Sequence, residues 1–409
     1  SVIFLFSFLI NFYFGHQGLM PLDDLQNFNS GFRVLNGDFP FRDYYSITGP
    51  FLDIWQANIY NLFGLSWQSF VIHASLMNCL YSLSIFLFLT KLKFNFIYSF
   101  FYSFSAGLLM YPPAGTPTVE HNSLILSVVA LLIFIIGLKE NEKKLLVISI
   151  FLFGISFFTK QVPTAYFIIF CAAIYISQIF SKLDIPNFIT ILISSISVLI
   201  VLLAYFSINN VSLLDIYEQY FIIASSLGKD RFNILNFNIF YENISKLFFL
   251  LFLLIPSFYI FLITKKKDVF LLIAGFCLII IFYEIHSNNQ PITFALLPLL
   301  LSFFHYYYTR EKLNLRFVEY FFYLIIFYTF FRILRYENLY LIILSFFIFF
   351  IFLKKKISIS LLFIIYLFIS SSLYFEKYIK IRAWDDLKKN DLSSSFDAII
   401  IDPKLKRLN

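Results

Sequence analysis

Long apolar runs alternate with short polar segments along most of the chain. The runs are rich in Phe, Leu and Ile, and most approach the roughly 20 residues that a helix needs to cross a ~30 Å hydrocarbon core. Lys160-Gln161 and Pro163 interrupt the run 145–180, so we predict two helices there rather than one. We predict thirteen membrane-spanning helices at residues 1–14, 67–90, 94–110, 122–138, 145–159, 162–180, 188–208, 247–263, 269–283, 292–308, 317–331, 339–353 and 357–375.

Composition supports this pattern. The chain of 409 residues is 60% hydrophobic and 13% charged, whereas soluble domains are about 25% charged. We therefore expect an all-α polytopic membrane protein, with a transmembrane domain over 1–375 and a tail over 376–409. The net charge of +7 comes from short basic clusters between apolar runs, which is typical of cytoplasmic loops rather than of a nucleic-acid surface. The three cysteines lie inside apolar runs, which indicates buried hydrophobic residues rather than a disulfide or metal site.

The basic clusters also predict an orientation. They occupy alternate loops, from Lys91 and Lys93 to the run 354–356, and the positive-inside rule makes these loops cytoplasmic. The amino terminus is then inside and the carboxyl terminus outside. The larger loops, at 15–66, 111–121, 209–246, 284–291 and 376–409, face outward. The first span covers only about 21 Å, so we expect the given sequence to start inside it. We interpret the short tail as a truncated or a vestigial outer domain.

The first outer loop, 15–66, contains two segments with helical spacing of apolar residues. The first has Leu25, Phe28, Phe32 and Leu35 and ends at Asn36-Gly37; the second has Leu52, Trp55, Ile59 and Leu62 and ends at Gly64. We predict two amphipathic helices on the membrane surface. Pro40, Gly49 and Pro50 predict an extended, turn-rich connection between them.

The loop carries four carboxylates before Pro50. Asp23 and Asp24 open the first surface helix, where acids also stabilise the positive end of a helix without any catalytic role. At 100° per residue, Asp23 points away from the apolar stripe and Asp24 flanks it, which makes Asp23 the better-placed general base for an acceptor hydroxyl. We expect Asp43 with Arg42 to shape the loop and Asp38 to be merely solvated.

The run Asp23-Asp24-(x)12-Gly37-(x)2-Pro40-(x)2-Asp43 resembles the first-loop signature of the GT-C superfamily of membrane glycosyltransferases, which includes protein O-mannosyltransferase-like and aminoarabinose-transferase-like enzymes. Here Gly37-Asp38-Phe39-Pro40-Phe41-Arg42-Asp43 departs from the usual Gly-x-x-Pro-Tyr-Arg-Asp only at Phe41. The resemblance implies inverting transfer of a sugar from a polyprenyl-phosphate carrier at the outer face of the cytoplasmic membrane. It also implies catalytic roles for Asp23 and Asp24. A metal is not indicated.

Several further outward-facing residues are candidates for binding the phosphate or the substrate. Each also has an ordinary interpretation: an interfacial pair at Glu120-His121, a snorkelling side chain at Lys160, and a solvated loop histidine at His286. The candidates are Arg42, Asp43, Glu120, His121, Lys160, Gln161 and His286.

The sequence thus favours a glycosyltransferase that uses a polyprenyl-phosphate-linked sugar and a protein, lipid or glycan acceptor. One alternative is a transporter or flippase of lipid-linked sugars, which should show ionisable groups at mid-membrane and inverted repeats. A second is a surface-polysaccharide polymerase or ligase, which we expect to carry its largest outer loop late in the chain.

Overall fold

The computed structural model describes residues 2–18, 23–182, 185–229 and four positions between 296 and 302. Nearly all of them belong to one compact unit that includes Ser1–Ser226. Within these residues the secondary structure is helical, and the one β-type contact is an isolated bridge between Pro40 and Tyr44. The all-α prediction is therefore confirmed for the described part of the chain.

Seven apolar helices correspond to the first seven predicted spans, with ends that differ by a few residues. They are α1 Val2–Gly15, α4 Trp67–Lys91, α5 Phe96–Leu109, α6 Val119–Glu140, α7 Lys143–Phe157, α8 Gln161–Lys182 and α9 Ile185–Ile208. The break near Lys160 separates α7 from α8 as predicted. The six spans predicted between 247 and 375 lie almost wholly outside the described residues, so the total of thirteen is not tested.

Three of the described helices are long and apolar enough to cross a membrane: α4, α6 and the segment Asn187–Ile208 of α9. Polar side chains bridge neighbouring helices in the interior. Ser7 bonds to Ser82 at 2.9 Å, and Ser127 bonds to Ser156 at 2.8 Å. Short hydroxyl and amide contacts of this kind let apolar helices approach closely where the hydrophobic effect does not drive association. The chain is a membrane protein.

The first loop forms the two expected helices, α2 Asp23–Leu35 and α3 Phe51–Phe63. Gly64 ends α3 with φ of 83°, a conformation that glycine adopts without strain. Of the four apolar positions at helical spacing in α3, Leu52 and Ile59 are buried in the protein, whereas Trp55 and Leu62 are 49% and 73% exposed. The inward side of α3 instead includes the polar residues Asp53 and Gln56, which find hydrogen-bond partners inside the protein.

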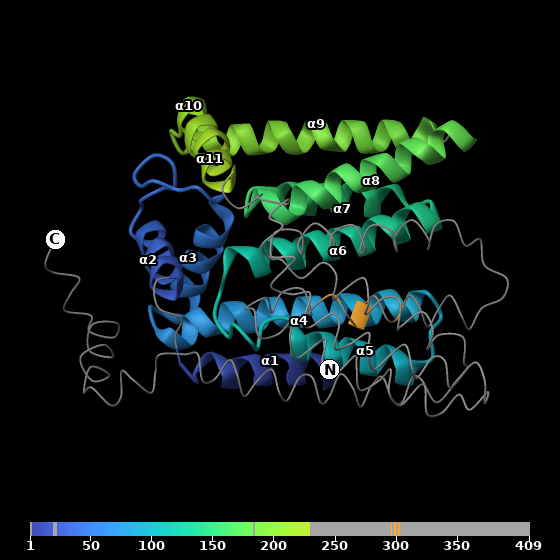
Figure 1. Ribbon diagram of the computed structural model, residues 1–409, viewed down its shortest axis with the longest axis horizontal. Helices are drawn as coiled ribbons and strands as arrows, with labels where there is room; N and C mark the ends of the chain where they lie inside the picture. The colour runs from blue at the N-terminus through green and yellow to red at the C-terminus, as the bar shows by residue number, and fades with distance from the viewer. Residues whose placement is uncertain are drawn as a thin grey trace, which may run out of the picture. The chain divides into compact units, whose positions relative to one another are not determined.

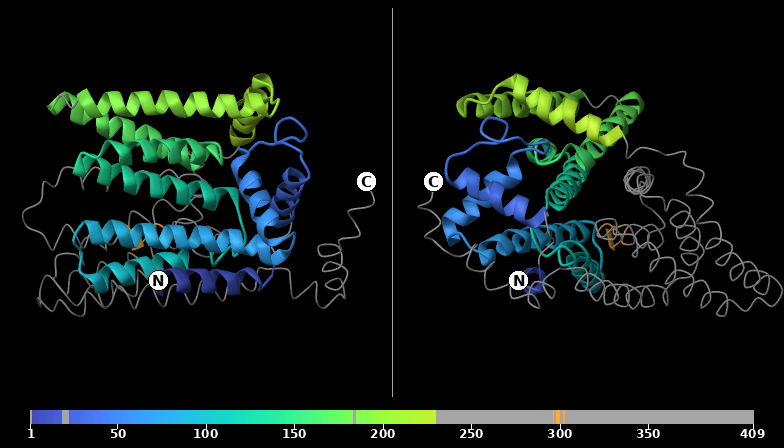
Figure 2. Two further views of the ribbon diagram at one scale, coloured as in Figure 1. Left: turned by 180° about the vertical axis from the view of Figure 1, so that it is seen from behind. Right: turned by 60° about the vertical axis from the view of Figure 1, so that its left-hand side comes forward.

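Figures 1 and 2 show α2 and α3 lying across one end of the lengthwise helices. Three hydrogen bonds bring the other connections of that end together: Asn27 to the carbonyl of Pro117, Gly49 to that of Thr159, and Arg42 to that of Asn209. We call this end the loop face. It comprises residues 23–66, 110–120, 158–161 and 209–226, the last of which form α10 Leu213–Ile216, the π-helix η1 Tyr217–Ile223 and the start of α11 Ala224–Lys229.

Candidate functional site

The two acids at the start of α2 have different environments. Asp23 is exposed, whereas Asp24 is fully buried. A carboxylate oxygen of Asp24 accepts a 2.6 Å hydrogen bond from the hydroxyl of Thr116 in the second loop. Asn27, one turn further along, donates to the carbonyl of Pro117 at 3.0 Å. Asp24 and Asn27 thus hold the first turn of α2 against residues 116–117 and leave Asp23 facing outward.

Glu120 and Lys160 come together at the loop face. Lys160 Nζ lies 2.7 Å from Glu120 Oε1, and the two side chains are 22% and 26% exposed. Glu120 stands in the first turn of α6, where a carboxylate is favoured by the helix dipole. The positive charge that Lys160 offers to an anionic ligand is therefore already partly neutralised by the carboxylate of Glu120.

His121 is built into the start of α6. Its ring stacks on Tyr111 with centroids 4.9 Å apart. The hydroxyl of Thr118 accepts from the His121 backbone N–H at 3.2 Å and lies 2.6 Å from ring Nδ1. The Thr118 hydroxyl thus holds both the backbone and the ring of His121 at the start of α6.

Gln161 bridges two parts of the loop face. Its side-chain amide donates to the carbonyl of Tyr220 at 2.6 Å and to that of Ile47 at 3.3 Å. Gln161 thus ties the connection between α2 and α3 to η1. These contacts use the donors that would otherwise be offered to a substrate.

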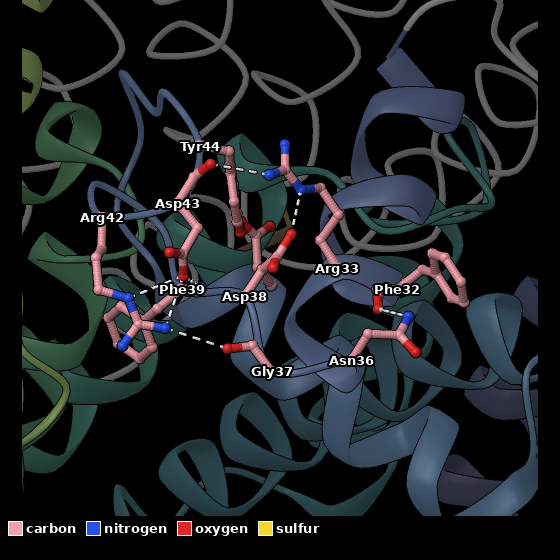
Figure 3. A network of polar contacts seen from close by, with 10 residues as sticks. Phe32, Arg33, Asn36, Gly37, Asp38, Phe39, Arg42, Asp43 and Tyr44 are labelled. Carbon is pink, nitrogen blue, oxygen red and sulfur yellow. Dashed lines mark hydrogen bonds and ion pairs between the residues drawn. The ribbon is translucent and has the colours of Figure 1, made fainter. Parts of the chain in front are cut away.

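Arg42 and Asp43 form an ion pair within the first loop, shown in Figure 3. Arg42 Nε and Nη2 lie 2.9 and 2.6 Å from Asp43 Oδ2, and Nη1 donates to the carbonyl of Asn209 at 2.7 Å. The same carboxylate accepts from the Phe39 N–H at 2.7 Å. The hydrogen bonds from Arg42 and then from Phe39 lower the pKa of Asp43 below its ordinary value. This pair holds the loop in shape.

A second ion pair in the same loop joins Arg33 and Asp38. Arg33 Nε is 2.8 Å from Asp38 Oδ2, and Arg33 Nη2 donates to the Asp43 carbonyl at 2.9 Å (Figure 3). The guanidinium also lies 4.4 Å over the ring of Tyr44. Asp38 is therefore paired rather than merely solvated, because the loop folds back on the last turn of α2.

Asp53 is a buried carboxyl group that the sequence analysis missed. It is 6% exposed and accepts hydrogen bonds from Ser30 Oγ at 2.7 Å and from the Tyr44 hydroxyl at 2.6 Å. Burial raises the pKa of Asp53 to about 6, although the two hydroxyl donors favour the ionised form. The spacing of Asp53, Gln56 and Tyr60 at i, i+3 and i+7 is the signal that would have identified this side of α3 as the inward one.

Gln56 belongs to a second buried network that also escaped the sequence analysis. His73 Nδ1 lies 2.7 Å from the Gln56 side-chain amide, and His73 Nε2 lies 3.1 Å from Asn122 Oδ1. Asn122 Nδ2 donates to the Thr118 carbonyl and to the Tyr111 hydroxyl, which fixes Oδ1 as an acceptor and puts the His73 proton on Nε2. Nδ1 then needs a donor, whereas the atom 2.7 Å from it is Gln56 Oε1, so we assign the Gln56 amide in the flipped orientation with its NH₂ group toward Nδ1.

The remaining predicted residue, His286, lies outside the described residues, as does the tail 376–409. In the described part of the chain, no group of three or more His, Cys, Asp or Glu side chains is arranged to hold a metal ion. The structure therefore brings Glu120 to Lys160 and ties Arg42, Asp43 and Gln161 into the loop face.

No family model matches the chain, and no curated protein matches it significantly.

Proposed function

We propose that the chain is an integral-membrane glycosyltransferase that moves a sugar from a polyprenyl-phosphate carrier to an acceptor hydroxyl, with Asp23 as the general base. The observation that carries the proposal is the separation of the acid pair. Asp24 is buried against Thr116 while Asp23 is exposed on the same helical turn. The buried Asp24 thus fixes the position of this helical turn, and the carboxylate of Asp23 remains open to a substrate.

The chemistry follows from this placement. Asp23 takes the proton of the acceptor hydroxyl, the acceptor oxygen forms a bond to the anomeric carbon, and the bond from that carbon to the phosphate oxygen breaks. The leaving polyprenyl phosphate gains negative charge, and Lys160 is the loop-face cation best placed to stabilise it. Lys160 must then share its charge between Glu120 and the phosphate. Arg42 serves the fold of the loop instead, because its donors are engaged with Asp43, Gly37 and Asn209.

The charge distribution supports an outward-facing site. The loop face contains eight acidic and three basic residues. At the other end of the same helices, residues 91–95 and 139–144 contain five lysines and two glutamates. By the positive-inside rule, the lysine-rich end belongs in the cytoplasm and the loop face outside, where polyprenyl-linked sugars are used by this class of enzyme.

The test is transfer of a radiolabelled sugar from polyprenyl-phosphate donors by the purified protein in vesicles. We expect wild type to transfer label with at least one donor and Asp23→Asn to lose transfer. Glu142→Gln is the matched control, because Glu142 is an exposed acid at the lysine-rich end and makes no capping hydrogen bond. Equal transfer by wild type and Asp23→Asn would refute the role of Asp23. Translocation of the labelled lipid without transfer for any donor would refute the enzyme and favour a flippase.

A further inference from the structure

The segment after α9 has one apolar side exposed and the other side built into the protein. Leu213, Leu214 and Tyr217 are 60%, 76% and 58% exposed, and Phe221 and Ile222 are 41% and 47% exposed. These residues belong to the predicted outward-facing loop 209–246. They form two consecutive short helices, α10 and η1, after the end of α9 (Figure 1).

The opposite side of this segment is fixed to the first loop. Ile216 and the fully buried Tyr220 pack in a cluster with Phe41 and Phe206. Gln219 donates to the Phe41 carbonyl at 3.0 Å and accepts from the Ser46 N–H at 2.9 Å. The exposed apolar side chains are therefore held in a fixed orientation.

The exposed side chains of α10 and η1 follow directly on an exposed apolar surface of α9. The segment Asn187–Ile208 of α9 is apolar enough to span a membrane, and its most apolar part is only 17% buried. Its exposed side chains recur at helical spacing along one stripe, which contains Ile189, Leu192, Ile193, Ile196, Leu199, Ile200 and Leu203. Ile208, at the end of α9, is 78% exposed and lies five residues before Leu213.

We propose that α10 and η1 form a membrane-interface anchor whose Leu213, Leu214, Tyr217, Phe221 and Ile222 side chains enter the boundary between headgroups and acyl chains. Large apolar side chains exposed together on one side of a short helix are characteristic of such elements, and a tyrosine suits this depth. Asp215 and Glu218 belong to the same two helices and remain at headgroup level, where a carboxylate stays hydrated. The anchor sets the height of the first loop above the bilayer, because Gln219 and Tyr220 connect it to Phe41 and Ser46. This inference is independent of the proposed enzymatic activity.

The test uses single spin labels in vesicles of neutral phospholipid. Cysteines are placed at Leu214 and Tyr217 in a chain whose native cysteines are replaced by alanine, with Asn36→Cys as a control at an exposed polar position of the first loop. Collision with oxygen, which concentrates in the acyl region, is compared with collision with a water-soluble nickel chelate. We expect the oxygen-to-nickel ratio at positions 214 and 217 to exceed that at 36 several-fold.

Two results of the spin-label experiment would overturn the proposal. Equal ratios at all three positions would place the segment in water. Exclusion of both reagents together with spin–spin broadening would show that a second copy of the chain covers the face instead of lipid. The unmodified protein gives a second measurement that needs no variant: a carbene-generating phospholipid should label the peptide containing 213–222 and spare the peptide containing 36–44. Absence of label on the first peptide would also overturn the anchor.

Discussion

Replacing Asp53 with asparagine should remove a pH dependence of stability that the buried carboxyl group creates. Burial raises the pKa of Asp53 from 3.8 to about 6. The folded state therefore binds this proton more tightly than the unfolded state does. The stabilisation is complete below pH 3.8 and is lost as the pH rises through about 6.

The size of the effect follows from the shift. About two pK units at 1.36 kcal/mol each amount to about 3 kcal/mol, of which about 2 kcal/mol falls between pH 4.5 and pH 8. Asparagine fits the same contacts without a charge. Its oxygen accepts from Tyr44 and its NH₂ group donates to Ser30 Oγ. The single hydroxyl hydrogen of Ser30, which points at Asp53 in the wild type, turns to the Asn27 carbonyl, 3.1 Å away.

The assay is reversible unfolding by sodium dodecyl sulfate in bicelles, measured for both proteins from pH 4.5 to 8. We expect the free energy of unfolding of wild type to fall by about 2 kcal/mol relative to Asp53→Asn across this range. The exposed acid Glu142 supplies the control, since Glu142→Gln should keep the wild-type slope. A constant difference between wild type and Asp53→Asn at every pH would refute the reasoning that links burial of Asp53 to its ionisation.

Two further substitutions test the packing of the loop face. Thr116→Val removes the hydroxyl that donates to Asp24 at 2.6 Å, so we expect the free energy of unfolding in SDS to fall by about 1–3 kcal/mol, with Thr116→Ser close to wild type. A fully stable Thr116→Val protein would contradict the role of this hydrogen bond in holding α2 against residues 116–117. Gly49→Ala would place a Cβ atom against the Phe158 carbonyl oxygen, so it should cost about 3 kcal/mol and expose the α2–α3 connection to trypsin. Gly37→Ala meets no atom within 4 Å and should cost only about 1 kcal/mol of backbone strain. Equal proteolysis of both alanine variants would argue against the close approach at Gly49.

The helices were predictable because the chain marks them strongly. Long runs of Phe, Leu and Ile bounded by lysine clusters or by glycine leave few alternative boundaries. Accordingly, α4 begins at the predicted Trp67, and α2 ends at Leu35, directly before the predicted stop at Asn36-Gly37. The exposure of Asp23 also agrees with the helical-wheel argument, whereas the buried residues of α2 are Asp24 and Gly31, and Leu25 of the predicted apolar stripe is 36% exposed. Local spacing was sufficient for these features because each depends on one helix alone.

The features that the sequence did not predict depend on contacts between distant parts of the chain. Arg42 is held by the carbonyl of Asn209, which is 167 residues away, and no local pattern indicates that partner. Apolar spacing in α3 drew attention to Leu52, Trp55, Ile59 and Leu62 and gave no sign that Asp53 is buried. Hydrogen bonds from Tyr44 and Ser30 permit that burial, because they satisfy a carboxyl group that would otherwise be too costly to bury.

The most direct test of the proposed function is the turnover of Asp23→Asn beside that of wild type and Glu142→Gln, with saturating polyprenyl-phosphate sugar in vesicles. Loss of a general base should lower kcat by roughly 10²–10⁴-fold. We expect KM for the donor to stay near the wild-type value, because Asp23 acts on the acceptor. Wild-type kcat in Asp23→Asn would contradict the central claim that the exposed acid of the pair carries the chemistry.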